Sequence, residues 1–273
     1  ESAEELAGFV KATKESINHD LPSSLQVDLD WSSYAGKRRH LPWYLLACFA
    51  LTQAGTKIFM HGASGHTAGR LYTQNILEDL NLPIANSWQE VEKQITDNNF
   101  SYMPLSALSP SLHSIIQLRN TLGLRSPVHS LSRLLNPLNA DCVIQGIFHP
   151  GYSPSHQKAG QLLGYKHVCV MKGEGGEIER NPDADTKAHI VQNGELSEAI
   201  WPKMHDKRHV KPEALELKDL ISVWRGTSKD SYAVSAVTGT MAIALSLLDA
   251  NNNQQEALTK AQDIWSQRDK AFI

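Results

Sequence analysis

Cysteine is scarce in this 273-residue sequence, and its three residues, Cys48, Cys142 and Cys169, lie far apart in apolar runs. No Cys-X-X-Cys pair occurs, which excludes the common cysteine-based metal motifs. We expect buried thiols of the kind kept in a reducing compartment, and hence a cytoplasmic protein. The sequence starts at Glu1 without a methionine or a basic and apolar leader. This start favours a piece of a longer chain and gives no indication of secretion.

Long apolar runs and a strong charge imbalance are also absent. No stretch of about 18 apolar residues occurs, so no membrane-spanning segment is expected. Lysine and arginine number 26 against 29 acidic residues, which gives a net charge of -3. The whole molecule is therefore not a cationic nucleic-acid binder, and any polyanion site must be a local basic patch. The 12 histidines are scattered and show no metal-binding motif such as HExxH.

Short apolar segments alternate with longer amphipathic ones along the chain. Ser2 and Glu5 form a capping-box pattern, and Ser87 and Glu90 form another, so each pair predicts a helix start. Strands are expected at residues 25–29, 57–60, 100–103, 142–148, 167–171 and 188–191. Helices are expected at 2–17, 42–51, 69–80, 87–97, 110–122 and 154–163, and as a pair from residue 229 that turns at 251–253. This alternation predicts an α/β sheet covered by helices.

The most informative stretch is RNTLGLRSPVHSLSRLLNP, from Arg119 to Pro137. Pro110 precedes it, and a Met60-His61-Gly62 segment lies further upstream. In order and spacing these pieces resemble glycosyltransferase family 3, the anthranilate phosphoribosyltransferase-like family of tryptophan biosynthesis. The matching family segments read KHGN, HPAMK…VRRELG and RTIFN-LGPLTNP. The resemblance covers about residues 1–190.

The resemblance implies a nucleoside phosphorylase/phosphoribosyltransferase-like fold, with a large α/β sheet domain and a small all-helical domain. Residues 1–22 and 106–136 would form the helical domain, and residues 23–105 and 137–273 the α/β domain, with a cleft between the two. It also implies a homodimer that forms through the helical domain.

Four residues take substrate-binding roles by this resemblance: His61, Gly62, Arg119 and Arg125. Arg119 matches the arginine that holds the acceptor's carboxylate in the enzymes, and a bidentate arginine contact suits a carboxylate. The residues themselves leave other readings open. His61 equally fits a packed histidine, and Arg119 fits a surface arginine on a helix.

The family's GTGGD loop, which holds the diphosphate, is replaced here by LDWSSYAGKRRH. The glycines that let backbone approach a phosphate are gone. A compact basic tract follows instead, and its side chains suit phosphate oxygens of a diphosphate or a nucleic acid. The predicted phosphate-binding residues are Ser32, Ser33, Lys37, Arg38 and Arg39. A solvated loop is the alternative.

The segment KGEGGEIE falls where the family has a G-x-DGLDE metal-binding turn. Glu177 and Glu179 stand two residues apart, and their oxygens are ligands that suit Mg²⁺. The resemblance thus implies a magnesium site at these two residues. A polar, glycine-rich hairpin with exposed acids is the alternative.

Two functions remain open at this level. The first is binding of phosphoribosyl pyrophosphate or another phosphorylated or anionic ligand in the interdomain cleft, with possible phosphoribosyl transfer. The second is non-catalytic, salt-sensitive binding of DNA or RNA, because the altered loops look similar to the diverged YbiB-like subgroup. A second basic stretch supports this alternative, although it also fits an exposed loop; it contains Lys203, Lys207, Arg208 and Lys211.

Overall fold

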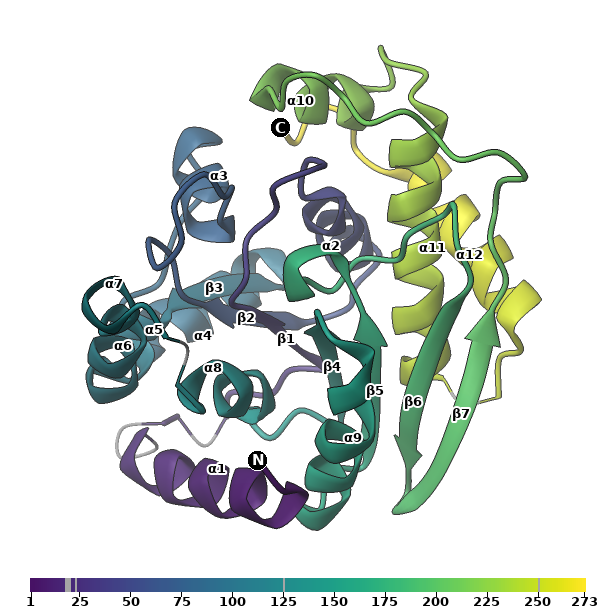
Figure 1. Ribbon diagram of the computed structural model, residues 1–273. Helices are drawn as coiled ribbons and strands as arrows, with labels where there is room; N and C mark the ends of the chain where they lie inside the picture. The colour runs from purple at the N-terminus through teal and green to yellow at the C-terminus, as the bar shows by residue number, and fades with distance from the viewer. Residues whose placement is uncertain (18–20, 23, 125, 250) are drawn as a thin grey trace.

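The computed structural model describes residues 1–17, 21–22, 24–124, 126–249 and 251–273, which form a seven-stranded sheet covered by helices (Figure 1). The strands are β1 (Leu29–Ser33), β2 (Ile58–Gly62), β3 (Phe100–Pro104), β4 (Cys142–Ile147), β5 (His167–Lys172), β6 (Thr186–Gln192) and β7 (Glu195–Trp201). Their order is β3-β2-β1-β4-β5-β6-β7. The first five are parallel, while β6 and β7 are antiparallel. The predicted α/β class is confirmed.

Helices cover both faces of this sheet. They are α1 (Ala3–Ile17), α2 (Trp43–Gln53), α3 (Thr73–Asp79), α4 (Trp88–Asn98), α5 (Leu105–Leu108), α6 (Pro110–Gln117), α7 (Arg119–Leu122), α8 (Val128–Leu131), α9 (Ser153–Leu162), α10 (Leu217–Arg225), α11 (Ser231–Leu248) and α12 (Gln254–Gln267). Three short 3-10 turns, η1 (Ser132–Leu134), η2 (Pro150–Tyr152) and η3 (Glu174–Gly176), complete the elements. Met60 packs into the core with α2 and α11, whereas its neighbour Phe59 packs with α1 and α4. This alternation follows from the two-residue period of a strand.

Helix α11 is the central helix of one layer. By length and apolar composition it would pass as a membrane span, but 72% of it is buried inside this fold. It packs against α2 and α12 and touches β4 and β5 (Figure 1). A helix that is apolar on all sides is expected in such a core position. The three cysteines are buried and free, as predicted.

Both predicted helix starts are confirmed. The backbone N–H of Glu5 donates to Ser2 Oγ at 3.1 Å, and Glu5 in return accepts from the backbone N–H of Ser2 at 2.8 Å. Ser87 Oγ likewise accepts from the backbone N–H of Glu90. These contacts satisfy amide groups that have no partner within the helix.

The first strand was predicted four residues too early. Its polar end, with Ser32 and Ser33, resembles a loop in sequence, yet β1 runs from Leu29 to Ser33 because the whole strand pairs with β2, and its first three residues also pair with β4. The second strand was expected to end at residue 60, whereas β2 also includes His61 and Gly62.

Strand β7 and helix α10 were not predicted. β7 is an exposed, charged edge strand, which gives a weak apolar pattern. The Asn193-Gly194 pair before it has positive φ angles of 49° and 86°, the standard signal of a tight hairpin. The division of the chain into two domains stays a prediction: α1 packs against α9 and α8, and shares its apolar cluster with α4.

Candidate functional site

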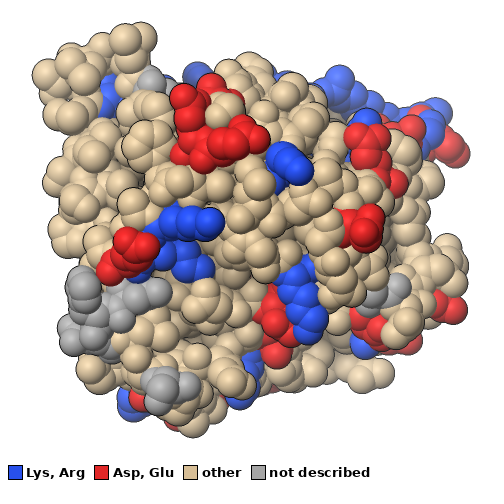
Figure 2. All heavy atoms as spheres, turned by 90° about the horizontal axis from the view of Figure 1, so that it is seen from below, with Lys and Arg blue, Asp and Glu red and all other residues tan. Residues whose placement is uncertain are grey.

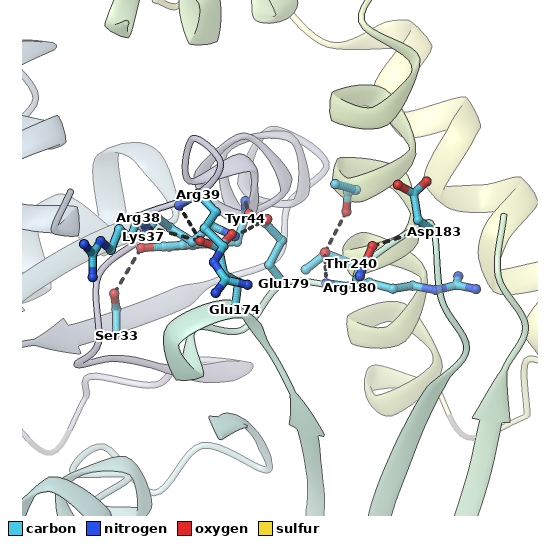
Figure 3. A network of polar contacts seen from close by, with 12 residues as sticks. Ser33, Lys37, Arg38, Arg39, Tyr44, Glu174, Glu179, Arg180, Asp183 and Thr240 are labelled. Carbon is cyan, nitrogen blue, oxygen red and sulfur yellow. Dashed lines mark hydrogen bonds and ion pairs between the residues drawn. The ribbon is translucent and has the colours of Figure 1, made fainter. Parts of the chain in front are cut away.

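Two segments meet at the carboxyl ends of the parallel strands. The first, here called the basic loop, is residues 34–40 after β1. The second, the carboxylate turn, is residues 173–179 after β5 and includes η3. In parallel sheets this edge is where ligands usually bind. Figure 3 shows side chains of the two segments pointing toward one another across this edge.

The Glu177 side chain lies at the start of the basic loop. One carboxylate oxygen accepts the backbone N–H groups of Ala35 and Gly36, each at 2.6 Å. The other oxygen accepts the hydroxyl of Ser33 at 2.9 Å. The Glu177 side chain is fully buried. Two adjacent backbone N–H groups and a hydroxyl form a cradle for an anion, and here a carboxylate of the same chain occupies it.

Lys37 is buried as well and forms two ion pairs. Its Nζ lies 2.5 Å from Glu179 Oε1 and 3.0 Å from Glu174 Oε2. Burial alone would lower the pKa of Lys37, but the charges of Glu179 and Glu174 outweigh it and raise that pKa. Burial raises the pKa of Glu179, and the negative charge of Glu174 adds to this effect, while the charge of Lys37 opposes it. Lys37 is therefore a charged group satisfied by protein carboxylates.

The remaining carboxylate oxygens bind backbone amides. Glu179 Oε2 accepts the N–H of Tyr44 at 3.0 Å, in the first turn of α2, where the helix dipole favours negative charge. Glu174 Oε1 accepts the N–H groups of Arg38 and Arg39, at 3.3 and 2.5 Å. Figure 3 displays these contacts as one continuous network. The carboxylate turn thus binds the basic loop along its whole length.

Two glycines allow this close approach. A Cβ on Gly173 would lie 1.6 Å from the carbonyl oxygen of Glu177, and a Cβ on Gly146 of β4 would lie 2.5 Å from the Glu177 carbonyl carbon. Real Cβ atoms do not reach such distances, so both positions require glycine. The glycines of KGEGGE therefore shape the turn that aims Glu177 at the basic loop.

Glu177 and Glu179 were predicted as magnesium ligands. Each of their oxygens accepts from an N–H group, a hydroxyl or Lys37. Mg²⁺ needs oxygen ligands in an octahedral arrangement, whereas the polar neighbours of these carboxylates in the described residues are mainly nitrogen donors. The two residues in this arrangement do not fit a Mg²⁺ ion. The magnesium site stays a prediction that requires the turn to move.

The predicted phosphate-binding residues fall into two groups. Ser32, Ser33 and Lys37 are buried. Ser33 donates to Glu177, and Lys37 forms ion pairs with Glu174 and Glu179. Arg38 and Arg39 have exposed side chains. Of the five, only these two side chains are presented to solvent.

His61 and Gly62 are core residues in this structure. His61 Nδ1 lies 2.6 Å from the hydroxyl of Tyr34, and Nε2 lies 3.2 Å from Asp30 Oδ1, all fully or almost fully buried. A Cβ on Gly62 would lie 1.9 Å from the carbonyl oxygen of Ser33. These contacts explain both residues by packing, and their substrate-binding role stays a prediction.

Arg119 begins α7, and its Nη1 donates to Thr67 Oγ1 at 2.5 Å, on a half-buried surface. Arg125 lies outside the described residues. Arg70, which the motif comparison missed, reaches the basic loop and donates to the carbonyl oxygen of Ala35 at 2.8 Å. Arg133 is buried and donates to the carbonyl oxygen of Gly146. Arg70 and Arg133 thus use their guanidinium groups to bind backbone carbonyls.

A third segment, here called the outer loop, is residues 202–216 between β7 and α10. Tyr232 of α11 links it to the basic loop. The ring of Tyr232 stacks on His40 with centroids 4.3 Å apart and meets the ring of His209 at 5.6 Å. The side chains of Lys207, Arg208 and Lys211 are exposed. The two basic stretches noted in the sequence therefore approach each other at His40 and His209, which both contact Tyr232.

The face seen in Figure 2 is different. Positive and negative side chains are interspersed there among uncharged residues, without a broad patch of one sign. This face lies on the side of α1 and away from α10 (Figure 1). The described residues on this face therefore offer no extended basic surface for a polyanion.

Comparisons with known proteins agree with this fold. A sequence profile of the glycosyl transferase family, a/b domain, matches residues 44–267. An uncharacterised protein of Aquifex aeolicus is 30% identical over 207 residues, which cover 74% of this chain and 60% of that protein. Anthranilate phosphoribosyltransferase of Paraburkholderia phymatum is 30% identical over 172 residues, 63% of this chain and 50% of the enzyme. The chain thus spans about half to three fifths of the length of these relatives.

Solved structures share the fold at lower identity. Anthranilate phosphoribosyltransferase from Saccharomyces cerevisiae, in complex with PRPP and Mg, matches 97% of this chain and 76% of its own with a TM-score of 0.78 and 19% identity. The enzyme from Thermus thermophilus matches 97% of this chain and 81% of its own with a TM-score of 0.75 and 19% identity. With the profile match over most of its length, this chain belongs to glycosyl transferase family 3.

Proposed function

We propose that this chain binds the phosphates of a nucleic acid, DNA or RNA, through exposed basic side chains and does not transfer a phosphoribosyl group. The observation that carries the proposal is the position of Glu177. Its carboxylate takes the two backbone N–H groups and the serine hydroxyl that would otherwise hold a diphosphate. A diphosphate would have to displace a buried, fully hydrogen-bonded carboxylate and would meet two further carboxylates beside Lys37.

The proposed phosphate surface consists of the exposed cations of the basic loop and the outer loop: Arg38, Arg39, Lys203, Lys207, Arg208 and Lys211. Most of them have no carboxylate partner among the ion pairs of the described residues; Lys203 lies 3.8 Å from the exposed Asp206. Phosphate contacts of this type give binding that weakens with salt and reads little sequence. The proposal also fits a molecule whose net charge is slightly negative, because the patch is local.

Phosphoribosyl transfer is the second candidate. It is favoured by the fold shared with the yeast enzyme, which was solved in complex with PRPP and Mg. In this chain it would require the carboxylate turn to leave the basic loop, so that Glu177 frees the anion cradle. The magnesium site, the homodimer and the cytoplasmic location that the family resemblance or the composition implies also stay proposals.

The test compares two ligands on the same protein. Phosphoribosyl pyrophosphate with Mg²⁺ is titrated by calorimetry, and a labelled single-stranded oligonucleotide is titrated by fluorescence anisotropy at low and moderate salt. We expect oligonucleotide binding that weakens as salt rises, and no saturable heat from the sugar diphosphate. Saturable, Mg²⁺-dependent binding of the sugar diphosphate would overturn the proposal in favour of the second candidate.

A matched pair of variants locates the surface. Arg38→Glu with Arg39→Glu reverses two charges on the basic loop, and Lys11→Glu with Lys260→Glu reverses two exposed charges on α1 and α12. The first variant should flatten the slope of log affinity against log salt by about 0.7 for each lost phosphate contact. The second should leave that slope unchanged. Equal effects of the two variants would show that only net charge matters and would exclude the proposed surface.

A further inference from the structure

The outer loop crosses the segment that leads from the carboxylate turn into β6. There Asp183 meets His205 and His209, and one potential metal-ligand atom of each lies within 4.8 Å of the other two. His205 and His209 lie four residues apart in the outer loop, whereas Asp183 precedes β6, so the sequence alone does not bring the three residues together.

The contacts of Asp183 show how the cluster is held. Oδ2 accepts the backbone N–H of His209 at 2.8 Å, and Oδ1 lies 2.8 Å from Nδ1 of the same histidine. The Asp183 side chain is only 4% exposed. A carboxylate at that burial needs cationic or donor partners. The contact between Oδ1 and Nδ1 therefore requires a proton or a metal ion between the two atoms.

The two histidines offer further support. Nε2 of His209 lies 3.0 Å from the hydroxyl of Ser231, at the start of α11. A hydrogen bond at that nitrogen fixes the ring and leaves Nδ1 for a metal. The ring of His205 lies 4.6 Å from that of His209, and its Nε2 is buried without a hydrogen-bond partner in the described part of the chain. A buried imidazole nitrogen without a partner is costly unless a ligand satisfies it.

We propose that Asp183, His205 and His209 form a binding site for a divalent transition metal, with Zn²⁺ as the best fit. Two imidazole nitrogens and one carboxylate oxygen suit Zn²⁺ in a tetrahedron, whereas Mg²⁺ and Ca²⁺ prefer sites built from oxygens. Three protein ligands leave the fourth position for a water molecule or an anionic ligand.

A metal ion would draw the three ligand atoms, which now lie within 4.8 Å of one another, to equal distances. Ligand bonds of about 2.0–2.1 Å in a tetrahedron place donor atoms roughly 3.3 Å apart. The contact between Asp183 Oδ1 and His209 Nδ1 would open by about half an ångström as the metal replaces the proton. Met204 donates its backbone N–H to Pro182, and Lys203 donates its own to Asp185, so the two segments already lie side by side.

A metal ion here would tie the outer loop to the end of the sheet. Lys207 and Arg208 lie between the two histidine ligands in sequence, so the ion would hold these exposed cations in one conformation. The site does not depend on the proposed function, because its ligands take no part in the contacts of the carboxylate turn.

Binding of the metal alone tests the proposal. Protein without a histidine tag is stripped with a chelator, and Zn²⁺ is titrated by calorimetry and by competition with a coloured chelator. We expect one Zn²⁺ per chain with a Kd of about 10 µM or tighter. Co²⁺ in place of Zn²⁺ should give the intense visible bands of tetrahedral coordination.

Variants separate a metal site from a hydrogen-bonded cluster. Asp183→Asn keeps the size of the side chain and its hydrogen bond to the backbone of His209, but it removes the charge that a metal needs. His205→Ala removes a ligand whose Nε2 makes no hydrogen bond among the described residues. Each should weaken Zn²⁺ binding at least about tenfold. His149→Ala, an exposed histidine on another loop, should not change it.

Three results would overturn the proposal. These are Zn²⁺ binding by the wild type that is no tighter than by Asp183→Asn, a Co²⁺ spectrum of octahedral type, or an equal loss of binding in His149→Ala. Circular dichroism of each variant shows whether it is folded. If His205→Ala fails to fold, Asp183→Asn alone decides between a metal site and a hydrogen-bonded cluster.

Discussion

The carboxylate turn and the outer loop border the same basic loop, but the turn contains buried charged side chains and the outer loop contains exposed ones. In the carboxylate turn, Glu177 and Glu179 are at most 2% exposed and every oxygen has a donor. In the outer loop, Lys207 and Arg208 are exposed to solvent. Burial rather than residue type therefore separates charges that hold the fold from charges available to a ligand.

The same contrast appears within three consecutive residues. Lys37 pairs its backbone with Leu71 in an isolated bridge, which turns its side chain inward to Glu179. Arg38 and Arg39 use only their backbone N–H groups in the network and leave their side chains outside. A basic run read as one phosphate-binding tract is thus divided by the local backbone into a structural lysine and two solvent-facing arginines.

Lys37→Met should have the largest effect on stability. It leaves the buried Glu179 without its cation, which costs about 3–5 kcal/mol. The exposed pair of Lys93 with Asp97 gives the matched control, since Lys93→Met should cost about 0–1 kcal/mol. Urea unfolding followed by circular dichroism measures both.

Combining Lys37→Met with Glu179→Gln sharpens this result. The double variant no longer leaves a charge at position 179 without its cation and should recover part of the loss. If Lys37→Met unfolds at the same urea concentration as Lys93→Met, the inner ion pair does not stabilise the fold and the contrast between the regions fails.

Glu177→Ala should have the next largest effect, and its result bears on function. It removes the acceptor of two buried N–H groups, which costs about 1–3 kcal/mol. The freed cradle should then bind inorganic phosphate, so added phosphate should raise the melting temperature of this variant more than that of the wild type. Glu198→Ala, which removes an exposed glutamate, is the control. A phosphate response no larger than that of the control would show that the cradle is not an anion site.

Much of the fold could be predicted because the strands have clear apolar patterns and the helices carry capping residues. The strand pairing that places Ser32 and Ser33 inside the sheet could not, since a polar strand end resembles a loop until its neighbours are known. The edge strand β7 was missed because its side chains face solvent, although Asn193-Gly194 marks its hairpin.

The candidate site was predicted only in its location. The basic loop and the carboxylate turn were both singled out, but as ligands of a diphosphate and a metal. That they bind each other depends on two glycines, Gly146 and Gly173, whose lack of a Cβ lets the turn reach the loop. The cluster of Asp183 with two histidines depends on the path of the outer loop, which local sequence does not encode.

Gly62→Ala should have a smaller but clear effect. Its Cβ would lie 1.9 Å from the backbone of Ser33, so β1 and β2 must shift apart at their ends, at a cost of about 1–3 kcal/mol. Gly8→Ala is the control, because a Cβ there meets nothing within 4 Å in the described residues, and it should stabilise α1 by up to about 1 kcal/mol. If Gly62→Ala leaves the free energy of unfolding unchanged, the result would favour a substrate-binding role for this glycine over the packing role.

Glu174→Gln should have the smallest effect, and one that depends on pH. Burial alone would raise the pKa of Glu174, but Lys37 and the N–H of Arg39 lower it below its ordinary value of 4.5. The folded protein thus binds this proton less readily than the unfolded chain. The stabilisation from Glu174 is present above about pH 4.5 and is lost as pH falls through the lowered pKa. At neutral pH the variant should unfold about 1 kcal/mol more easily than the wild type, and the difference should shrink toward pH 3. If the difference in the free energy of unfolding between variant and wild type stays constant over this pH range, the charge of Glu174 does not contribute to stability. Glu179 alone would then balance the charge of Lys37.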